Sequence, residues 1–258
     1  MNVKMALVSG SSQGIGRASA IALAQAGMNV VLIARDETRL RSVLNELANN
    51  GEQHHQILVA DFTNPSALQQ KIGDFISEGN IIHVLINNTG GPKGGPIIEA
   101  NIEEFTNTFN QHLICNHILA QAVVPGMKKA GFGRIINVIS TSVKQPLPNL
   151  GVSNTIRGAV ANWSKTLAME LGPFGITVNN VLPGATNTAR LNSIASTKAE
   201  KTGETADLIL KEMAKESPMQ RIAEPEEVAA AIAFLASTSA GYINGINLPV
   251  DGGRTKSL

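Results

Sequence analysis

The sequence predicts a doubly wound α/β fold, in which one parallel sheet lies between two layers of helices. Short runs that are apolar throughout alternate with longer stretches whose apolar residues recur at helical spacing. Strands without a polar face are buried on both sides, as they are in parallel sheets. A glycine-rich bend at residues 9–16 joins the first apolar run to the first helical stretch. Together these observations indicate three layers, α/β/α.

The expected elements follow one another in regular order. Apolar runs predict strands at 5–8, 29–34, 57–60, 82–86, 134–139 and 177–182, and a last strand within 245–253. Helical spacing predicts helices at about 17–26, 36–49, 64–76, 102–129, 149–171 and 225–236. The third helix starts at Asn64 and Pro65, because asparagine caps a helix and the fixed φ of proline suits its first turn.

The chain is expected to form one domain over residues 1–258. Its length suits a single α/β layer structure, and no repeat, low-complexity tract or linker divides it. The polar stretch from 184 to about 217 interrupts the alternation after the sixth strand. Long insertions at this end of a strand often cover a substrate, so we expect a helical lid at about 187–217, with a solvated surface excursion as the alternative.

Composition excludes several classes of partner. Aromatic residues make up only 3% of the chain, and the net charge is +1 without a basic patch, so nucleic acid is not expected. No apolar run approaches the roughly 20 residues of a membrane helix, and nothing resembles a signal peptide, so we expect no membrane partner and a cytoplasmic location. Cys115, the only cysteine, leaves no internal disulfide or cysteine-based metal site and is expected to be a small core residue.

The bend at residues 9–16 is a candidate anion site. A strand that stops at glycines and restarts as a helix leaves backbone N–H groups unpaired at the helix N-terminus. These groups and the helix dipole both attract phosphate. The alternative is an ordinary connection between a strand and a helix, in which small residues are also common.

Several short motifs resemble the short-chain dehydrogenase/reductase family over nearly the whole chain. They are Ser9-Gly10 with Gly14-Ile15-Gly16, Asp61 at the end of the third strand, Asn87-Asn88-Thr89-Gly90, Val178-Asn179, Pro183-Gly184 with Thr188, Pro225-Glu226-Glu227-Val228 and Val250-Asp251-Gly252-Gly253. The resemblance implies a seven-stranded Rossmann-type sheet, a nicotinamide dinucleotide, a small-molecule substrate and a homo-oligomer, either a tetramer or a dimer, built on the long fourth and fifth helices.

The resemblance also implies which residues contact the dinucleotide. They are Gly10, Ser12, Gln13, Gly14, Ile15, Gly16, Arg35, Asp61, Phe62, Asn88, Gly90, Arg157, Pro183, Gly184 and Thr188. An acidic residue at the end of the second strand selects NAD, whereas arginine there accommodates the 2′-phosphate of NADP. Ala34 takes the acidic position and Arg35 follows, which favours NADP(H) over NAD(H). Asp36 could instead reach the ribose, or cap the next helix.

The catalytic residues depart from the family pattern. Members usually carry an asparagine in the fourth helix, a serine after the fifth strand and a Tyr-x-x-x-Lys pair on the fifth helix. Ser140 matches the serine, but Ser153 and Arg157 stand at the tyrosine and lysine positions, and His112 stands at the asparagine. The only tyrosine, Tyr242, is expected to be a partly buried phenol near the last strand.

Three functions therefore remain open. The first is a carbonyl reductase or alcohol dehydrogenase in which His112, beside Ser140, supplies a proton because imidazole titrates near neutrality. The second is a catalytically inactive nucleotide-binding sensor or scaffold subunit. The third is non-redox chemistry, as in a lyase or isomerase. Lys93, Lys144 and Arg157 would favour an anionic substrate if they face the pocket, although loop lysines are usually solvated.

Overall fold

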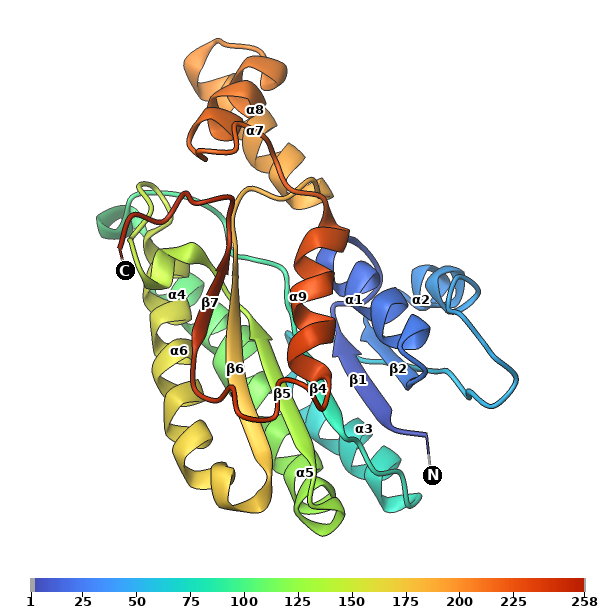
Figure 1. Ribbon diagram of the computed structural model, residues 1–258. Helices are drawn as coiled ribbons and strands as arrows, with labels where there is room; N and C mark the ends of the chain where they lie inside the picture. The colour runs from blue at the N-terminus through green and yellow to red at the C-terminus, as the bar shows by residue number, and fades with distance from the viewer. Residues whose placement is uncertain (1–2, 258) are drawn as a thin grey trace.

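Within the described residues, 3–257, the computed structural model holds a seven-stranded parallel sheet in the order β3-β2-β1-β4-β5-β6-β7 (Figure 1). The strands are β1 (Met5–Ser9), β2 (Asn29–Ala34), β3 (Gln56–Val59), β4 (Val84–Asn87), β5 (Gly133–Val138), β6 (Ile176–Pro183) and β7 (Asn247–Val250). The strand order reverses between β1 and β4, so the predicted doubly wound, Rossmann-type fold is confirmed. Residues 1, 2 and 258 of the predicted domain lie outside the described residues.

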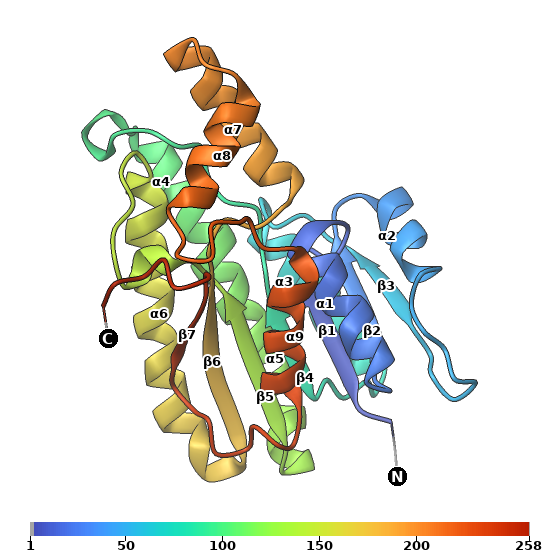
Figure 2. The same ribbon diagram turned by 45° about the horizontal axis from the view of Figure 1, so that its top comes forward.

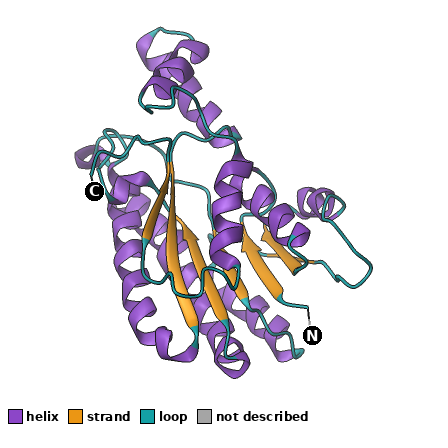
Figure 3. Ribbon diagram, viewed as in Figure 1, coloured by secondary structure: helices purple, strands orange, loops and turns teal. Residues whose placement is uncertain are grey.

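Helices cover both faces of the sheet (Figures 1 and 3). One face carries α1 (Gly14–Gln25), α2 (Glu37–Leu44) and α9 (Pro225–Ala236), and the other carries α3 (Pro65–Ser77), α5 (Cys115–Ala130) and α6 (Gly151–Leu171). Ala6 and Val8 of β1 enter one apolar cluster and Leu7 enters the other, because successive strand side chains point to opposite faces. The chain also forms α4 (Ile102–Phe109), α7 (Ala189–Thr202) and α8 (Ala206–Lys215).

The structure differs from the expected elements at three places. The helix expected at 102–129 is split, because residues 110–114 form a π turn between α4 and α5. The helix expected at 36–49 ends at Leu44. Tyr242 is fully exposed rather than partly buried, because it lies in the turn between α9 and β7.

A ladder of four asparagines, three of them buried and Asn247 half-buried, joins β4, β5, β6 and β7. Asn137 of β5 accepts a hydrogen bond from Asn87 at 2.8 Å and donates one to Asn180 at 3.0 Å. Asn180 in turn donates to Asn247 at 2.8 Å. The four residues are register partners on β4, β5, β6 and β7. A register slip would leave buried amides unpaired at roughly 1–3 kcal/mol each, so the ladder fixes the register of these four strands.

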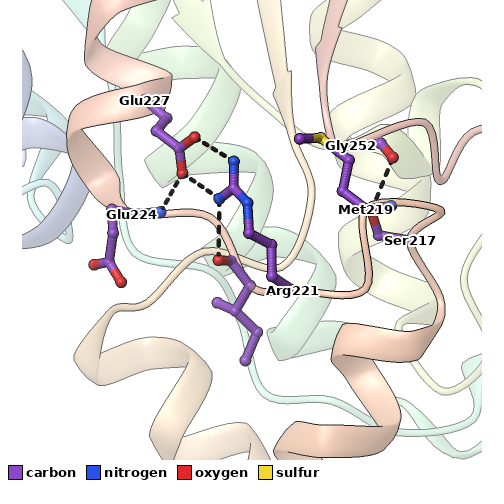
Figure 4. Close-up of polar contacts among 7 residues, drawn as sticks. Ser217, Met219, Arg221, Glu224, Glu227 and Gly252 are labelled. Atoms are coloured by element: carbon purple, nitrogen blue, oxygen red, sulfur yellow. Dashed lines mark hydrogen bonds and ion pairs between the residues drawn. The ribbon is translucent and has the colours of Figure 1, made fainter.

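Helices α7 and α8 project beyond the carboxyl edge of the sheet (Figures 1 and 2). They occupy most of the segment 187–217. Hydrogen bonds tie the chain that follows α8 to the rest of the fold, among them those drawn in Figure 4. Ser217 donates through its hydroxyl to the carbonyl of Gly252 at 2.9 Å, and Arg221 forms two hydrogen bonds of 2.6 Å with Glu227 of α9. The helix pair is therefore anchored at its base, while its far end extends from the body.

Candidate active site

The loops after β1, β4 and β6 meet at the carboxyl edge of the sheet, where the order of the strands reverses. The amide of Asn88 donates to Ser9 Oγ at 2.8 Å, which ties the β4 loop to β1. The methyl group of Thr188, after β6, lies 3.2 Å from the point that a Cβ on Gly14 would occupy. In open α/β sheets this crevice is the usual ligand site. The structure therefore brings these predicted cofactor residues together.

The glycine loop fits a phosphate group. Gly10 has a φ of +61°, and a Cβ on Gly16 would lie 2.2 Å from the carbonyl oxygen of Gly10 and 2.7 Å from the side-chain nitrogen of Asn88. Helix α1 begins without a side-chain cap or an acidic residue in its first turn, whereas Asp36 caps α2. The first amide groups of α1 are thus left for an anion, and the tight loop gives that anion close access to the backbone.

A positively charged edge lies beside this loop. Arg35 follows β2 and is exposed. Asp36 caps α2 by accepting from the amide of Arg39 at 3.0 Å, so the capping alternative for Asp36 is confirmed. The guanidinium of Arg39 also donates to Oε1 of Gln13 at 3.2 Å, which links α2 to the glycine loop. The carboxylate of Asp36, the acidic residue nearest the end of β2, is thus hydrogen-bonded to the helix that it caps.

Asp61 and Phe62 form the neighbouring edge after β3. A hydrogen bond from the Thr63 amide, with a further contribution from the charge of Arg35, holds the pKa of Asp61 below its usual range. The carbonyl of Phe62 accepts from the Cys115 thiol at 3.3 Å. Cys115 is buried, as expected for a core residue, and burial raises its pKa to about 12. Its thiol is therefore protonated and unreactive near neutral pH.

Arg157 of α6 connects the end of β5 to the predicted catalytic serines. Its Nη1 donates to the carbonyls of Val138 at 3.2 Å and Ile139 at 2.7 Å, the two residues before Ser140. Its Nε donates to Ser153 Oγ at 3.2 Å, one helical turn away. One guanidinium therefore fixes the backbone that carries Ser140 and holds the hydroxyl of Ser153.

The charge of Arg157 is not neutralised by an acidic side chain within residues 3–257. Burial, followed by the charge of Arg190, lowers its pKa to about 10. The group thus remains cationic at neutral pH. The hydroxyl of Ser140 accepts a hydrogen bond from the Ser142 amide at 3.1 Å, so both serines have oxygens held by N–H donors.

His112 lies in the π turn and is buried. Its Nε2 lies 3.0 Å from the carbonyl oxygen of Gly90, and its Nδ1 lies 2.8 Å from Thr89 Oγ1. A carbonyl only accepts, so Nε2 carries the hydrogen and Thr89 donates to Nδ1. Burial, followed by the charge of Arg157, lowers the pKa of His112 to about 3. The expectation that His112 titrates near neutrality beside Ser140 is therefore wrong: the imidazole is neutral and bonded to Thr89 and Gly90.

The stability of the protein is expected to fall on acidification from pH 6.5 toward pH 3. His112 has a folded pKa of about 3, below its ordinary 6.5, so in this window the unfolded chain binds a proton that the folded chain excludes. The free energy of unfolding then falls by up to about 1.4 kcal/mol per pH unit from this group. Urea unfolding of the parent and His112→Gln at pH 7, 5.5 and 4.5 measures the difference. Identical pH dependence in the two proteins would contradict the assignment.

Three residues of this site were not predicted from the sequence. Thr89 bonds to His112, Arg39 bonds to the glycine loop, and Arg190 approaches Arg157. Thr89 was named in the sequence analysis only as part of the motif Asn87-Asn88-Thr89-Gly90, without a role of its own. Arg190 was given no role, because it lies within the segment assigned to a lid.

A hollow of about 440 Å³ opens beside Ser142. It is lined by Ile97, Ser142, Pro146, Leu147, Asn149 and Asn154, among others. The residues come from the loop after β4, the loop before α6 and the first turns of α6. The two loops are joined by a hydrogen bond from the Gly95 amide to the Asn149 carbonyl at 2.8 Å.

Comparison with known proteins identifies the family. The family model described as enoyl-(acyl carrier protein) reductase matches residues 10–255. The NADPH-dependent reductase BacG of Bacillus subtilis is 32% identical over the full length of both chains, and the 3-oxoacyl-[acyl-carrier-protein] reductase FabG of Vibrio cholerae is 32% identical over 97% of this chain and 96% of its own. The chain therefore belongs to the short-chain dehydrogenase/reductase family.

Solved structures agree with this assignment. L-sorbose reductase from Gluconobacter frateurii, solved with NADPH and L-sorbose, superimposes with a TM-score of 0.92 at 32% identity, over 100% of this chain and 98% of that one. Between residues 3 and 257, no helix is both long and apolar enough to cross a membrane. The same residues hold no cluster of three or more histidine, cysteine or acidic side chains that could bind a metal ion.

Proposed function

We propose that this protein is an NADP(H)-dependent oxidoreductase that interconverts a small-molecule carbonyl compound and its alcohol. One observation carries the proposal: the uncapped N-terminus of α1 and its glycine loop lie next to an exposed Arg35, while Asp36 is engaged as a helix cap. The names of the relatives, which include NADPH-dependent reductases, support the same cofactor.

The proposed cofactor contacts follow from the family pattern and the geometry of the edge. They are Gly10, Ser12, Gln13, Gly14, Ile15, Gly16, Arg35, Asp61, Phe62, Asn88, Gly90, Arg157, Pro183, Gly184 and Thr188. The amides at the start of α1 would hold the pyrophosphate, and Arg35 would hold the 2′-phosphate. When bound, the dinucleotide supplies a hydride to the carbonyl carbon.

The proposed proton donor is a serine hydroxyl supported by Arg157. Ser153 and Arg157 take the positions of the family's tyrosine and lysine. Because Ser153 Oγ accepts from Arg157, its own hydrogen can be donated to the substrate oxygen, beside Ser140. The guanidinium would stabilise the negative charge left on Ser153 Oγ when its proton moves to the substrate oxygen, and water would then return a proton to Ser153. His112 and Thr89 act as positioning residues, because they hold the carbonyl of Gly90.

The helix pair α7–α8 is proposed to be a lid. Its base carries Thr188, whose methyl group would lie 3.2 Å from a Cβ on Gly14 of the glycine loop, and its far end extends beyond the sheet (Figure 2). A homo-oligomer built on α4–α5 and α6, the long fourth and fifth helices expected from the sequence, is also proposed. The large apolar side chains of Phe109 in α4 and Met169 in α6, both exposed in the single chain, support such an interface.

A second candidate is a nucleotide-binding protein without catalysis. It is favoured by the serine at position 153, since a serine hydroxyl is a poorer acid than the tyrosine phenol, and arginine stays protonated. NADPH oxidation at 340 nm over a panel of aldehydes and ketones separates the two functions. Turnover supports the oxidoreductase, and saturable NADPH binding without oxidation of any compound supports the binding protein.

Arg35→Ala is expected to weaken NADPH binding by about tenfold to a hundredfold and leave NADH binding nearly unchanged, since only NADPH carries the phosphate that the charge would bind. Titrations monitored by Trp163 fluorescence give both affinities. Arg41→Ala, which removes an exposed arginine of α2 paired with Glu37, is the matched control. An undiminished preference for NADPH in Arg35→Ala would refute the role of this residue.

A further inference from the structure

Arg157 of α6 and Arg190 in the first turn of α7 face the same point above Gly91. A Cβ built on Gly91 would lie 3.7 Å from Nη2 of Arg157, 3.6 Å from Nη2 of Arg190 and 3.7 Å from Nε of Arg190. Arg157 is partly buried and Arg190 is exposed at the rim. The three residues come from distant parts of the chain, so the fold assembles a place where two guanidinium groups converge.

Both guanidinium groups retain donors for a ligand. Arg157 donates from Nε and Nη1 to neutral acceptors, and its Nη2 has no hydrogen-bond acceptor among residues 3–257. Arg190 spends Nη2 on the carbonyl of Pro92, which leaves Nε and Nη1. Neither forms an ion pair with a carboxylate of the described residues, although Arg17, Arg221 and other arginines of the chain do.

The two positive charges of Arg157 and Arg190 repel each other, and partial burial adds to the free-energy cost of keeping both groups charged. Desolvation lowers the pKa of both groups, and Arg190 also lowers that of Arg157. An anion placed between them would remove the repulsion and form charge-assisted hydrogen bonds, which are the strong ones in proteins. A carboxylate has two oxygens in one plane, which matches donors that approach from two sides.

We propose that Arg157 and Arg190 together bind a carboxylate of the substrate, so that the carbonyl compound is a keto acid. This inference rests on the proposed function and adds the substrate class to it. Arg157 also holds Ser153 and the backbone before Ser140, so the bound carboxylate lies next to the hydroxyl groups proposed to meet the carbonyl oxygen. The carboxylate and the reacting carbonyl therefore belong to neighbouring parts of one small molecule.

Calorimetric titration tests the carboxylate site without turnover. The probes are phenylpyruvate and its methyl ester, added to the protein saturated with NADP+, which cannot reduce either. The parent is expected to bind the acid at least about tenfold more tightly than the ester. Arg190→Gln is expected to remove this preference, Arg190→Lys to retain part of it, and Arg41→Gln to leave it unchanged.

A second variant introduces a competing carboxylate into the proposed site. Gly91→Asp places a carboxylate within reach of both guanidinium groups at a position whose φ lies outside the left-handed region, so it should abolish acid binding and spare the ester. Gly91→Asn is its uncharged control and should retain acid binding. Because these variants leave both arginines in place, they also test the site if Arg190→Gln folds poorly.

Three results separate the outcomes. Equal binding of acid and ester to the parent overturns the proposal. The proposal is also overturned if Arg190→Gln loses affinity for NADP+ but still binds the acid more tightly than the ester. That result would assign the pair of arginines to a cofactor phosphate. Tight acid binding without NADPH oxidation by any keto acid supports the carboxylate site and counts against the proposed oxidoreductase instead.

Discussion

Gly16→Ala is expected to weaken NADPH binding by more than about a hundredfold, because it closes the loop proposed to hold the pyrophosphate. The added Cβ would lie 2.2 Å from the carbonyl oxygen of Gly10 and 2.7 Å from the side-chain nitrogen of Asn88. The closest of these atoms is backbone, so relief requires the start of α1 to move away from the loop. Fluorescence titration with NADPH measures the loss.

Gly73→Ala is the matched control for this substitution. Gly73 lies within α3, where a Cβ would meet no atom within 4 Å. This variant should bind NADPH like the parent and gain about 0.5–1 kcal/mol in free energy of unfolding, since alanine favours helix. Normal NADPH affinity in a folded Gly16→Ala protein would show that the glycine loop does not hold the cofactor.

Arg157→Ala is expected to lower kcat/KM for carbonyl reduction by about 10²–10⁴, through a lower kcat and, for a keto acid, also through a higher KM. The substitution removes the charge beside Ser153 and leaves the carbonyls of Val138 and Ile139 without this donor. Ser140 then loses its fixed backbone, and Ser153 loses the group that would stabilise its developing charge. Steady-state kinetics with NADPH and a keto acid measure the effect.

Two further variants separate catalysis from folding in this experiment. Arg157→Lys keeps the charge but loses the planar fork, so it should recover part of the rate. Lys165→Ala removes another cation of α6, which donates to the Gly245 carbonyl at 3.0 Å, and should leave kcat unchanged. Parent-like kcat in an Arg157→Ala protein that unfolds at the parent's temperature would exclude a catalytic role for this guanidinium.

Most of the fold was predictable because its strands are apolar on both faces. The bounds of β2 and α9 agree with the predicted ranges, and other strand ends differ by one or two residues. Asn64 caps α3 and Pro65 begins it, as local chemistry requires. The π turn at 110–114 was not predictable, because its residues keep helical periodicity and differ only in hydrogen-bond spacing.

The site was predictable where it depends on local sequence. Glycine spacing located the loop at residues 9–16, and the order of the later motifs led to Ser140 and Arg157. The ionisation of His112 was not predictable, because its low pKa arises from burial and from Arg157, which lies on another element. The approach of Arg190 to Arg157 likewise depends on where the loop after β6 places α7.

Isotope transfer is the most direct test of whether this chain reduces carbonyl compounds. NADPH deuterated at both C4 positions is incubated with the protein and a panel of keto acids and their esters, and the alcohols are examined by mass spectrometry. We expect one deuterium on the carbinol carbon for each NADPH oxidised, and faster labelling of the acids than of the esters. Saturable NADPH binding with no deuterium in any product would contradict the reductase assignment.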